Sequence, residues 1–278
     1  MSNIHPSAII EPGAKIGRNV TIEAYVIIKG TVTLEDGVCI KSHAYIDGNT
    51  TIGEGTIIWP SASIGTQTQD LKFQGETTFV RIGKNCSIRE FVTINSSCNE
   101  NSEVVVGDNC LIMAYCHIAH NCVLGNNVIM ANGAMLAGHV EVGDFANLGG
   151  MTPVHQNVRI GAYAMVGGFS RVTHDIPPFT IGAGVPYEVG GLNLVGLKRR
   201  GFSLEDRMEI AKAFKATYRS GLNPTEAIKK LKEELSDNRY LNEWIDFCEN
   251  TQRGLIGLSG VTQKGKQEII SDEDLAAK

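Results

Sequence analysis

Aliphatic residues recur at almost every sixth position of this chain between Ile4 and Val172. The series is broken by Asp70, Glu76 and Glu100. An amphipathic helix has a period near 3.6 residues and a half-buried strand has a period of 2, so neither element accounts for the pattern. A period of six is typical of hexapeptide repeats, in which the chain winds into a parallel β-helix.

Each six-residue unit predicts one short strand and one corner, and three units predict a triangular coil that buries one aliphatic residue per side. Successive coils stack at the strand-pairing distance of about 4.8 Å, so residues eighteen apart share a column. The segments 66–79 and 95–103 interrupt the coils without changing their phase, and we expect them to be loops inserted on the binding face.

The pattern ends after Pro177-Pro178, and a different period follows. Ser203 and Asp206 form a capping-box pattern before a helix that ends near Gly221. Pro224 opens a second predicted helix, and a third covers 240–248. The sequence therefore divides into a β-helix over residues 1–190, a small helical domain over 191–255 and a mobile polar tail over 256–278.

Composition predicts a cytoplasmic protein. The 278 residues are 42% hydrophobic, with no apolar run long enough to cross a membrane and no signal peptide at the start. The net charge of −5 argues against a nucleic-acid partner. The seven cysteines lack CxxC spacing, and Cys110, Cys116 and Cys122 are six apart, so they should face different sides of the coil as reduced, structural residues.

Four of the seven histidines are predicted to lie at one corner of three consecutive coils; they are His117, His120, His139 and His155. His120, Gly138 and Gln156 should share one column. Two chemistries fit such a cluster. Neutral imidazoles are good zinc ligands, as in hexapeptide carbonic anhydrases. An imidazole is also a good general base for a hydroxyl or an amine at neutral pH. The spacing alone does not decide between them.

Several segments resemble the acyl-carrier-protein-dependent UDP-N-acetylglucosamine O-acyltransferases, the family that begins lipid A synthesis. They are QDLK at 69–72, HIAHNC at 117–122, LAGHV at 136–140, GGMTPVHQ at 149–156 and GLKRRGF at 196–202. The resemblance covers about residues 4–256, and the segment DGNTTIGEGTIIWPSASIG is similar to the corresponding segment of chlamydial members. It implies a left-handed β-helix, which the period alone does not show.

The resemblance implies three catalytic residues. His120 matches the general base that removes the proton of the sugar 3-hydroxyl as it attacks the acyl thioester. Asp70, in the first inserted loop, matches the carboxylate that orients the imidazole and stabilises its charged form. Gly138 matches the position whose backbone N–H faces the oxyanion.

Other residues match substrate-binding positions of the family: Gln69, Lys72, His117, His139, His155, Gln156, Gly168, Asn193, Arg199 and Arg200. A guanidinium suits a diphosphate, and the arginines, with Lys212, Lys215 and Arg219, also suit the acidic acyl carrier protein. Many members carry Glu where this chain has Val195, so one polar contact near the nucleotide is missing. Gly168 leaves room for a long acyl chain, whereas the neighbouring Phe169 would shorten the groove.

The sequence therefore predicts a mainly β protein, a left-handed parallel β-helix with a small C-terminal α-helical domain. The resemblance implies a homotrimer with sites between subunits, acyl carrier protein and UDP-N-acetylglucosamine as substrates, and no metal or redox cofactor. The alternatives are an N-acyltransferase for a UDP-3-amino sugar, a hexapeptide zinc carbonic anhydrase, and a non-catalytic scaffold that would not need His120, Gly138 and Asp70. Acyl chain length is not predicted.

Overall fold

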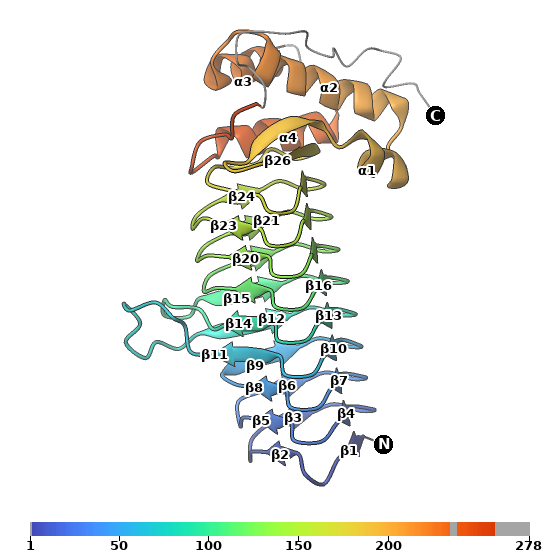
Figure 1. Ribbon diagram of the computed structural model, residues 1–278, viewed down its shortest axis with the longest axis vertical. Coiled ribbons are helices and arrows are strands. Elements are labelled where there is room, and N and C mark those ends of the chain that lie inside the picture. The colour runs from blue at the N-terminus through green and yellow to red at the C-terminus, as the bar shows by residue number, and fades with distance from the viewer. Residues whose placement is uncertain (1, 234–237, 259–278) are drawn as a thin grey trace.

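The computed structural model describes residues 2–233 and 238–258, which form a tall stack of triangular coils with helices gathered at the C-terminal end (Figure 1). The three sides of the stack are three sheets. The coils pair in parallel, as for Thr21 with Cys39 and Ile57 with Cys39 in one sheet. The predicted parallel β-helix is therefore confirmed, with one coil for every eighteen residues wherever no insertion intervenes.

The first sheet has eleven strands, whose last pair is antiparallel. They are β1 (Asn3–Ile4), β4 (Thr21–Ile22), β7 (Cys39–Ile40), β10 (Ile57–Ile58), β13 (Ser87–Ile88), β16 (Leu111–Ile112), β19 (Ile129–Met130), β22 (Asn147–Leu148), β25 (Met165–Val166), β26 (Thr180–Ala183) and β27 (Glu188–Leu192). The hairpin of β26 and β27 closes the stack, and the sequence pattern did not predict it.

The second and third sheets have eight strands each. The second contains β2 (Ile9–Ile10), β5 (Ile27–Ile28), β8 (Tyr45–Ile46), β11 (Ser63–Thr66), β14 (Thr93–Asn95), β17 (His117–Ile118), β20 (Met135–Leu136) and β23 (Pro153–Val154). The third contains β3 (Lys15–Ile16), β6 (Thr33–Leu34), β9 (Asn49–Ile52), β12 (Phe79–Ile82), β15 (Glu103–Val106), β18 (Val123–Leu124), β21 (Glu141–Val142) and β24 (Arg159–Ile160).

The core inside the triangle is built from two residues per side, not one as the sequence analysis predicted. Ile22 and Ile40 are almost fully buried, and so are Val20 and Val38, each two positions earlier. The second row uses smaller side chains because it lies where the sides converge, close to the corners. Cys110, Cys116 and Cys122 belong to this row, precede strands of three different sheets and are free thiols, as predicted.

The helices are α1 (Leu194–Arg199), α2 (Leu204–Arg219), α3 (Pro224–Glu233) and α4 (Arg239–Glu249). The predicted capping box is confirmed, because the Asp206 backbone N–H donates to Ser203 Oγ at 3.0 Å. Pro224 occupies the first position of α3, as expected. No helix within the described residues is long and apolar enough to cross a membrane.

The prediction of a mobile tail from residue 256 is wrong for its first three residues. Ile256 is buried, and its backbone N–H donates to the Asp175 carbonyl oxygen at 2.9 Å. Leu258 forms a parallel bridge with Val189 of β27. Burial of these apolar side chains against the end of the β-helix fixes the chain here. The remainder of the predicted tail, 259–278, lies outside the described residues.

Stability should depend on pH through Glu243 on α4, which lines a cavity of about 630 Å³ against the third sheet. Burial, and then the Asp144 carboxylate, raise the pKa of Glu243 from 4.5 to about 7, whereas Arg239 lowers it. The folded state thus binds a proton that the unfolded state releases between these values, so folding loses stability as pH rises through about 7. We expect Glu243→Gln to reduce the fall in Tm between about pH 5 and 8, measured by thermal unfolding. An equal fall in wild type, Glu243→Gln and the exposed control Glu205→Gln would contradict this assignment.

Candidate functional site

A pocket of about 410 Å³ opens on the second sheet beside the predicted histidine corner. Its walls include the strand ends at Leu136 and Val154 and part of the first inserted loop. Six of the residues predicted for the site line it together: Gln69, Asp70, His117, His120, Gly138 and Gln156. The sequence columns therefore brought His117, His120, Gly138 and Gln156 together, whereas the coil residues His139 and His155 lie outside the pocket lining.

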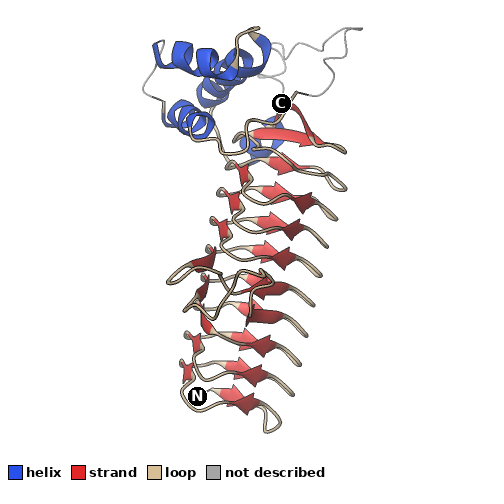
Figure 2. Cartoon of the chain, turned by 90° about the vertical axis from the view of Figure 1, so that its left-hand side faces the viewer, coloured by secondary structure: helices blue, strands red, loops and turns tan. Residues whose placement is uncertain are grey.

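Two loops project together from the side of the stack next to this pocket (Figures 1 and 2), and the first of them supplies its acidic residue, Asp70. They are residues 67–78, between β11 and β12, and residues 96–102, between β14 and β15. The Thr77 N–H donates to Glu100 Oε2 at 2.8 Å, and the Asn101 N–H donates to the Thr77 carbonyl oxygen at 2.8 Å. These bonds tie the loops to each other. The insertion at 66–79 thus contributes to the pocket, as expected.

His120 is the residue around which the polar groups converge. Its Nε2 lies 3.8 Å from Asp70 Oδ2, and both side chains are largely buried, at 17% and 23% exposed. Its Nδ1 lies 3.0 Å from Asn121 Oδ1. An amide oxygen only accepts hydrogen bonds, so this contact favours the tautomer with hydrogen on Nδ1. Nε2 then has a free lone pair and faces Asp70.

Asn121 is a site residue that the sequence analysis missed. The orientation of its side-chain amide agrees with two hydrogen bonds: Nδ2 donates to Asn99 Oδ1 at 3.4 Å, and Oδ1 accepts from Cys98 Sγ at 2.9 Å. The backbone of Asn121 is left-handed, with φ 57°. Asn is common in that conformation, and the same corner position carries Asn elsewhere, as at Asn109 and Asn127. Its place beside a histidine in HIAHNC was the only available signal.

Gly138 packs directly on the imidazole of His120. A Cβ built on Gly138 would lie 2.9 Å from His120 Nδ1 and closer still to Cε1 and Nε2, so only glycine fits the observed ring position. Among the described residues, no protein acceptor takes the Gly138 backbone N–H. The arrangement confirms the predicted column and leaves a donor beside the candidate base.

His117 and His139 flank His120 as neutral imidazoles. Burial, and then the charge that His120 can carry, lower the pKa of both side chains. His117 Nδ1 lies 2.7 Å from Thr93 Oγ1, and the His139 ring meets the His120 ring edge-on with centroids 5.1 Å apart. At neutral pH the neighbours therefore add no positive charge that would oppose protonation of His120.

The other predicted site residues do not line this pocket of the single chain. They are Lys72, His139, His155, Gly168, Asn193, Arg199 and Arg200. Asn193 caps α1, because its Oδ1 accepts from the Gly196 N–H at 3.1 Å and its Nδ2 donates to the Tyr163 carbonyl oxygen at 3.0 Å. The Arg200 guanidinium lies 4.5 Å from the centre of the Phe145 ring, and Arg199 is exposed.

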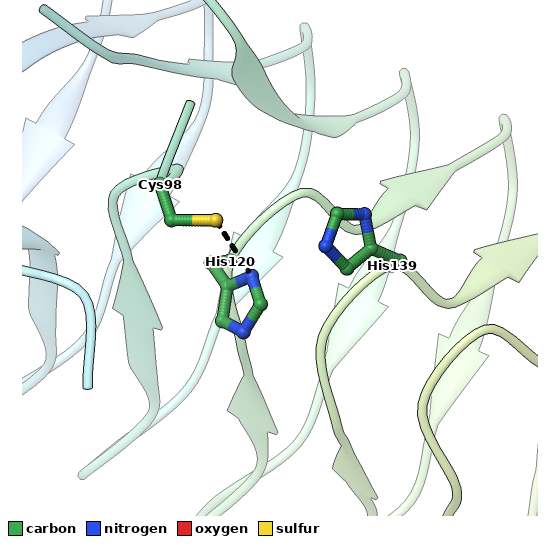
Figure 3. Close-up of side chains that lie close together, drawn as sticks. All are labelled: Cys98, His120 and His139. Atoms are coloured by element: carbon green, nitrogen blue, oxygen red, sulfur yellow. Dashed lines mark hydrogen bonds between the residues drawn. The ribbon is translucent and has the colours of Figure 1, made fainter. Parts of the chain in front are cut away.

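Cys98 also differs from its prediction as a purely structural residue. All seven cysteines are free thiols, but Cys98 is half-buried in the second loop with its sulfur 3.4 Å from His120 Nδ1 (Figure 3). The sequence could not place it, because residue 98 lies in an insertion where the period gives no position. The site thus holds a thiol next to the candidate base.

Two family models match parts of the chain. One is described as UDP N-acetylglucosamine O-acyltransferase, domain 2, and matches residues 175–256. The other, bacterial transferase hexapeptide (six repeats), matches residues 103–138. Together they cover a part of the coils that carries His120 and the segment that contains the helices.

Whole-chain relatives agree with these models. Acyl-(acyl-carrier-protein)–UDP-N-acetylglucosamine O-acyltransferases of Chlamydia pneumoniae and Chlamydia abortus are 57% and 55% identical to the chain. The alignments cover 99% of this chain and 98% of the first relative, and 98% of both chains for the second. The solved UDP-N-acetylglucosamine acyltransferase from Campylobacter jejuni is 42% identical, covers 92% of this chain and 99% of its own, and has a TM-score of 0.86.

Proposed function

The chain belongs to the family of acyl-(acyl-carrier-protein)–UDP-N-acetylglucosamine O-acyltransferases, and we propose that it transfers a fatty acyl group from acyl carrier protein to the 3-hydroxyl of UDP-N-acetylglucosamine, the first step of lipid A synthesis. The observation that carries the proposal is the pocket in which His120 Nε2 faces Asp70, against Gly138. The names of the relatives favour this reaction over N-acylation of an amino sugar and over carbonic anhydrase activity.

In the proposed mechanism, His120 Nε2 takes the proton of the 3-hydroxyl while the sugar oxygen bonds to the thioester carbon. The tetrahedral intermediate carries its negative charge on the former carbonyl oxygen, which the Gly138 N–H stabilises. Asp70 stabilises the imidazolium. The intermediate then collapses, the C–S bond breaks, and the carrier thiolate takes the proton from His120, which restores the base. No step needs a metal or a redox group.

We further propose that the binding residues act in two groups. Those at or beside the pocket hold the reacting sugar: Gln69, His117 and Gln156, which line it, and Lys72, His139 and His155, which lie outside its lining. Those toward the helical end hold the acyl chain and the diphosphate: Gly168, Asn193, Arg199 and Arg200. Asn193 contributes by capping α1, which ends at Arg199 and has Arg200 as its C-cap residue.

The two groups are not joined in one pocket of the single chain, so the proposal includes a homotrimer in which neighbouring chains complete each site. It places the enzyme in the cytoplasm and keeps the predicted division near residues 190 and 191, with the second domain extended through Leu258. Val195 is exposed on α1 and replaces an acidic residue of many members. We therefore expect the nucleotide to rely more on the arginines here.

An acyl transfer assay tests the proposed function. Carrier proteins that bear a series of acyl chains would each be offered with UDP-N-acetylglucosamine and with its 3-amino analogue. Ester formation on the hydroxyl sugar is the expected product for at least one chain length. Exclusive amide formation, or no transfer from any carrier, would overturn the assignment. The preferred chain length would also show whether Phe169, which is 75% exposed beside Gly168, shortens the acyl groove.

Substitution of the two arginines at the C-terminal end of α1, Arg199 and the C-cap residue Arg200, should weaken substrate binding. We expect Arg199→Ala and Arg200→Ala to raise KM for UDP-N-acetylglucosamine or for the carrier about tenfold, because a guanidinium grips a diphosphate with two hydrogen bonds. Arg199→Lys should also be impaired, and carrier-dependent rates should fall with salt. The control is Arg18→Ala, at an exposed ion pair with Asp36 in the N-terminal coils. Kinetics equal to wild type at low and high salt would leave the arginines as surface charge.

A further inference from the structure

Three metal-ligating side chains meet at the base of the second loop, on the side of His120 that faces away from Asp70. Cys98, His120 and His139 each offer one ligand atom, and these atoms all lie within 4.8 Å of one another. Cys98 Sγ is 3.4 Å from His120 Nδ1. Figure 3 shows the sulfur directed at that nitrogen and the His139 ring turned toward both groups.

The cluster has the dimensions and chemistry of a zinc site. Bonds of about 2.3 Å to sulfur and 2.0 Å to nitrogen place tetrahedral ligand atoms about 3.3 to 3.7 Å apart. The distance between Cys98 Sγ and His120 Nδ1 already meets this requirement. The ring nitrogen of His139 would have to move about an ångström closer to these two atoms. Asn121 Oδ1, 2.9 Å from the sulfur and 3.0 Å from Nδ1, or a water would complete the tetrahedron. One thiolate and two imidazoles favour zinc over magnesium or calcium.

We propose that this chain binds one Zn²⁺ through Cys98 Sγ, His120 Nδ1 and a ring nitrogen of His139, and that the bound ion inhibits acyl transfer. Coordination of Nδ1 requires that the hydrogen of the neutral ring move to Nε2. Nε2–H then donates toward Asp70 and has no lone pair for the sugar proton. Zinc binding itself does not depend on the proposed function, whereas the inhibition rests on the role of His120 as base.

Zinc must displace the thiol proton. Burial, and then Asp70 and Glu76, raise the pKa of the Cys98 thiol, and Lys72 opposes them. The charged groups that act on the thiol are thus these three side chains of the first loop, and ring nitrogens of His120 and His139 lie within 4.8 Å of the sulfur. Because the ligand is the thiolate, zinc binding should release the thiol proton and weaken as the pH falls.

Cobalt is the direct probe of the site, because a thiolate bound to Co²⁺ gives a charge-transfer absorption that imidazoles do not. We expect the full-length protein to bind one Co²⁺ per chain with this band, and added Zn²⁺ to abolish it. Cys98→Ser should lack the band. Cys39→Ser, which changes a half-buried cysteine of β7 far from the pocket, should keep it. A band of equal intensity in Cys98→Ser would overturn the proposal.

Zinc inhibition is tested by the rate of acyl transfer, because zinc at His120 Nδ1 would leave Nε2 without a lone pair for the sugar proton. Zn²⁺ should lower kcat of the wild-type enzyme with little change in KM for UDP-N-acetylglucosamine, and a chelator should restore the rate. Measured against its own zinc-free rate, Cys98→Ser should need at least about tenfold more Zn²⁺ for the same fractional inhibition. Equal zinc sensitivity of the two proteins would refute the inhibitory site. An inactive wild-type protein that still shows the cobalt band would instead refute the proposed function and leave the metal site intact.

Discussion

Replacement of His120 by alanine should reduce kcat by about 10²- to 10⁴-fold, the usual loss when a general base is removed. An alcohol is a poor nucleophile without a base, and among the described residues His120 is the histidine that lies against Asp70. The ring is largely buried at the pocket but fills no position in the hydrophobic core, so the variant should fold and assemble as wild type does. Single-turnover acyl transfer and size-exclusion chromatography would measure the two effects separately.

The matched control is His174→Ala, which removes an exposed histidine near the end of the coils. It should keep the wild-type rate. The kcat of Asp70→Asn should lie between those of His120→Ala and His174→Ala. This variant keeps the His120 ring in place but removes the charge that stabilises the imidazolium. If His120→Ala retained more than a third of the wild-type kcat, His120 would not be the base, and another group at the pocket would have to accept the proton.

The coils of this fold could be predicted almost residue by residue because their constraint repeats. Each side of each coil must bury an aliphatic residue, so the period survives both insertions: Ile52 pairs with Ile82, and Thr93 with His117, across whole six-residue units. The hairpin of β26 and β27 and the packed residue Ile256 lack such a repeat. Their positions depend on tertiary contacts with the end of the stack, which no local pattern records.

The candidate site divides in the same way. His120, Gly138 and Gln156 were placed by column arithmetic, because they lie on uninterrupted coils. Asp70 and Cys98 lie in insertions, where period gives no position, so Asp70 came from family resemblance and Cys98 was missed. Asn121 was hidden for another reason. Asn commonly adopts the left-handed conformation found at this corner, so the backbone alone explains why Asn stands at position 121. Only the contact of its Oδ1 with His120 Nδ1 shows that the side chain also belongs to the site.

Gly138→Ala should reduce kcat by at least about 10²-fold with little change in Tm. The new Cβ would meet the His120 ring closer than van der Waals contact allows, so the ring must leave its position against Asp70. It would also crowd the backbone N–H that is proposed to stabilise the oxyanion, and loss of such a donor alone costs about 10²- to 10³-fold. Thermal unfolding and acyl transfer kinetics would measure both quantities. The control is Gly190→Ala in β27, where the nearest atom lies at ordinary contact distance, 3.5 Å.

The double variant His120→Ala/Gly138→Ala separates two effects of the alanine methyl group at position 138: displacement of the His120 ring and obstruction of the oxyanion. If it acts only by displacing the His120 ring, the double variant should be no slower than His120→Ala, because the ring is already absent. If it also obstructs the oxyanion, the double variant should lose a further factor of about ten or more. A Gly138→Ala enzyme with wild-type kcat would contradict both, and would show that the ring can shift without loss of the proton transfer that is proposed for it.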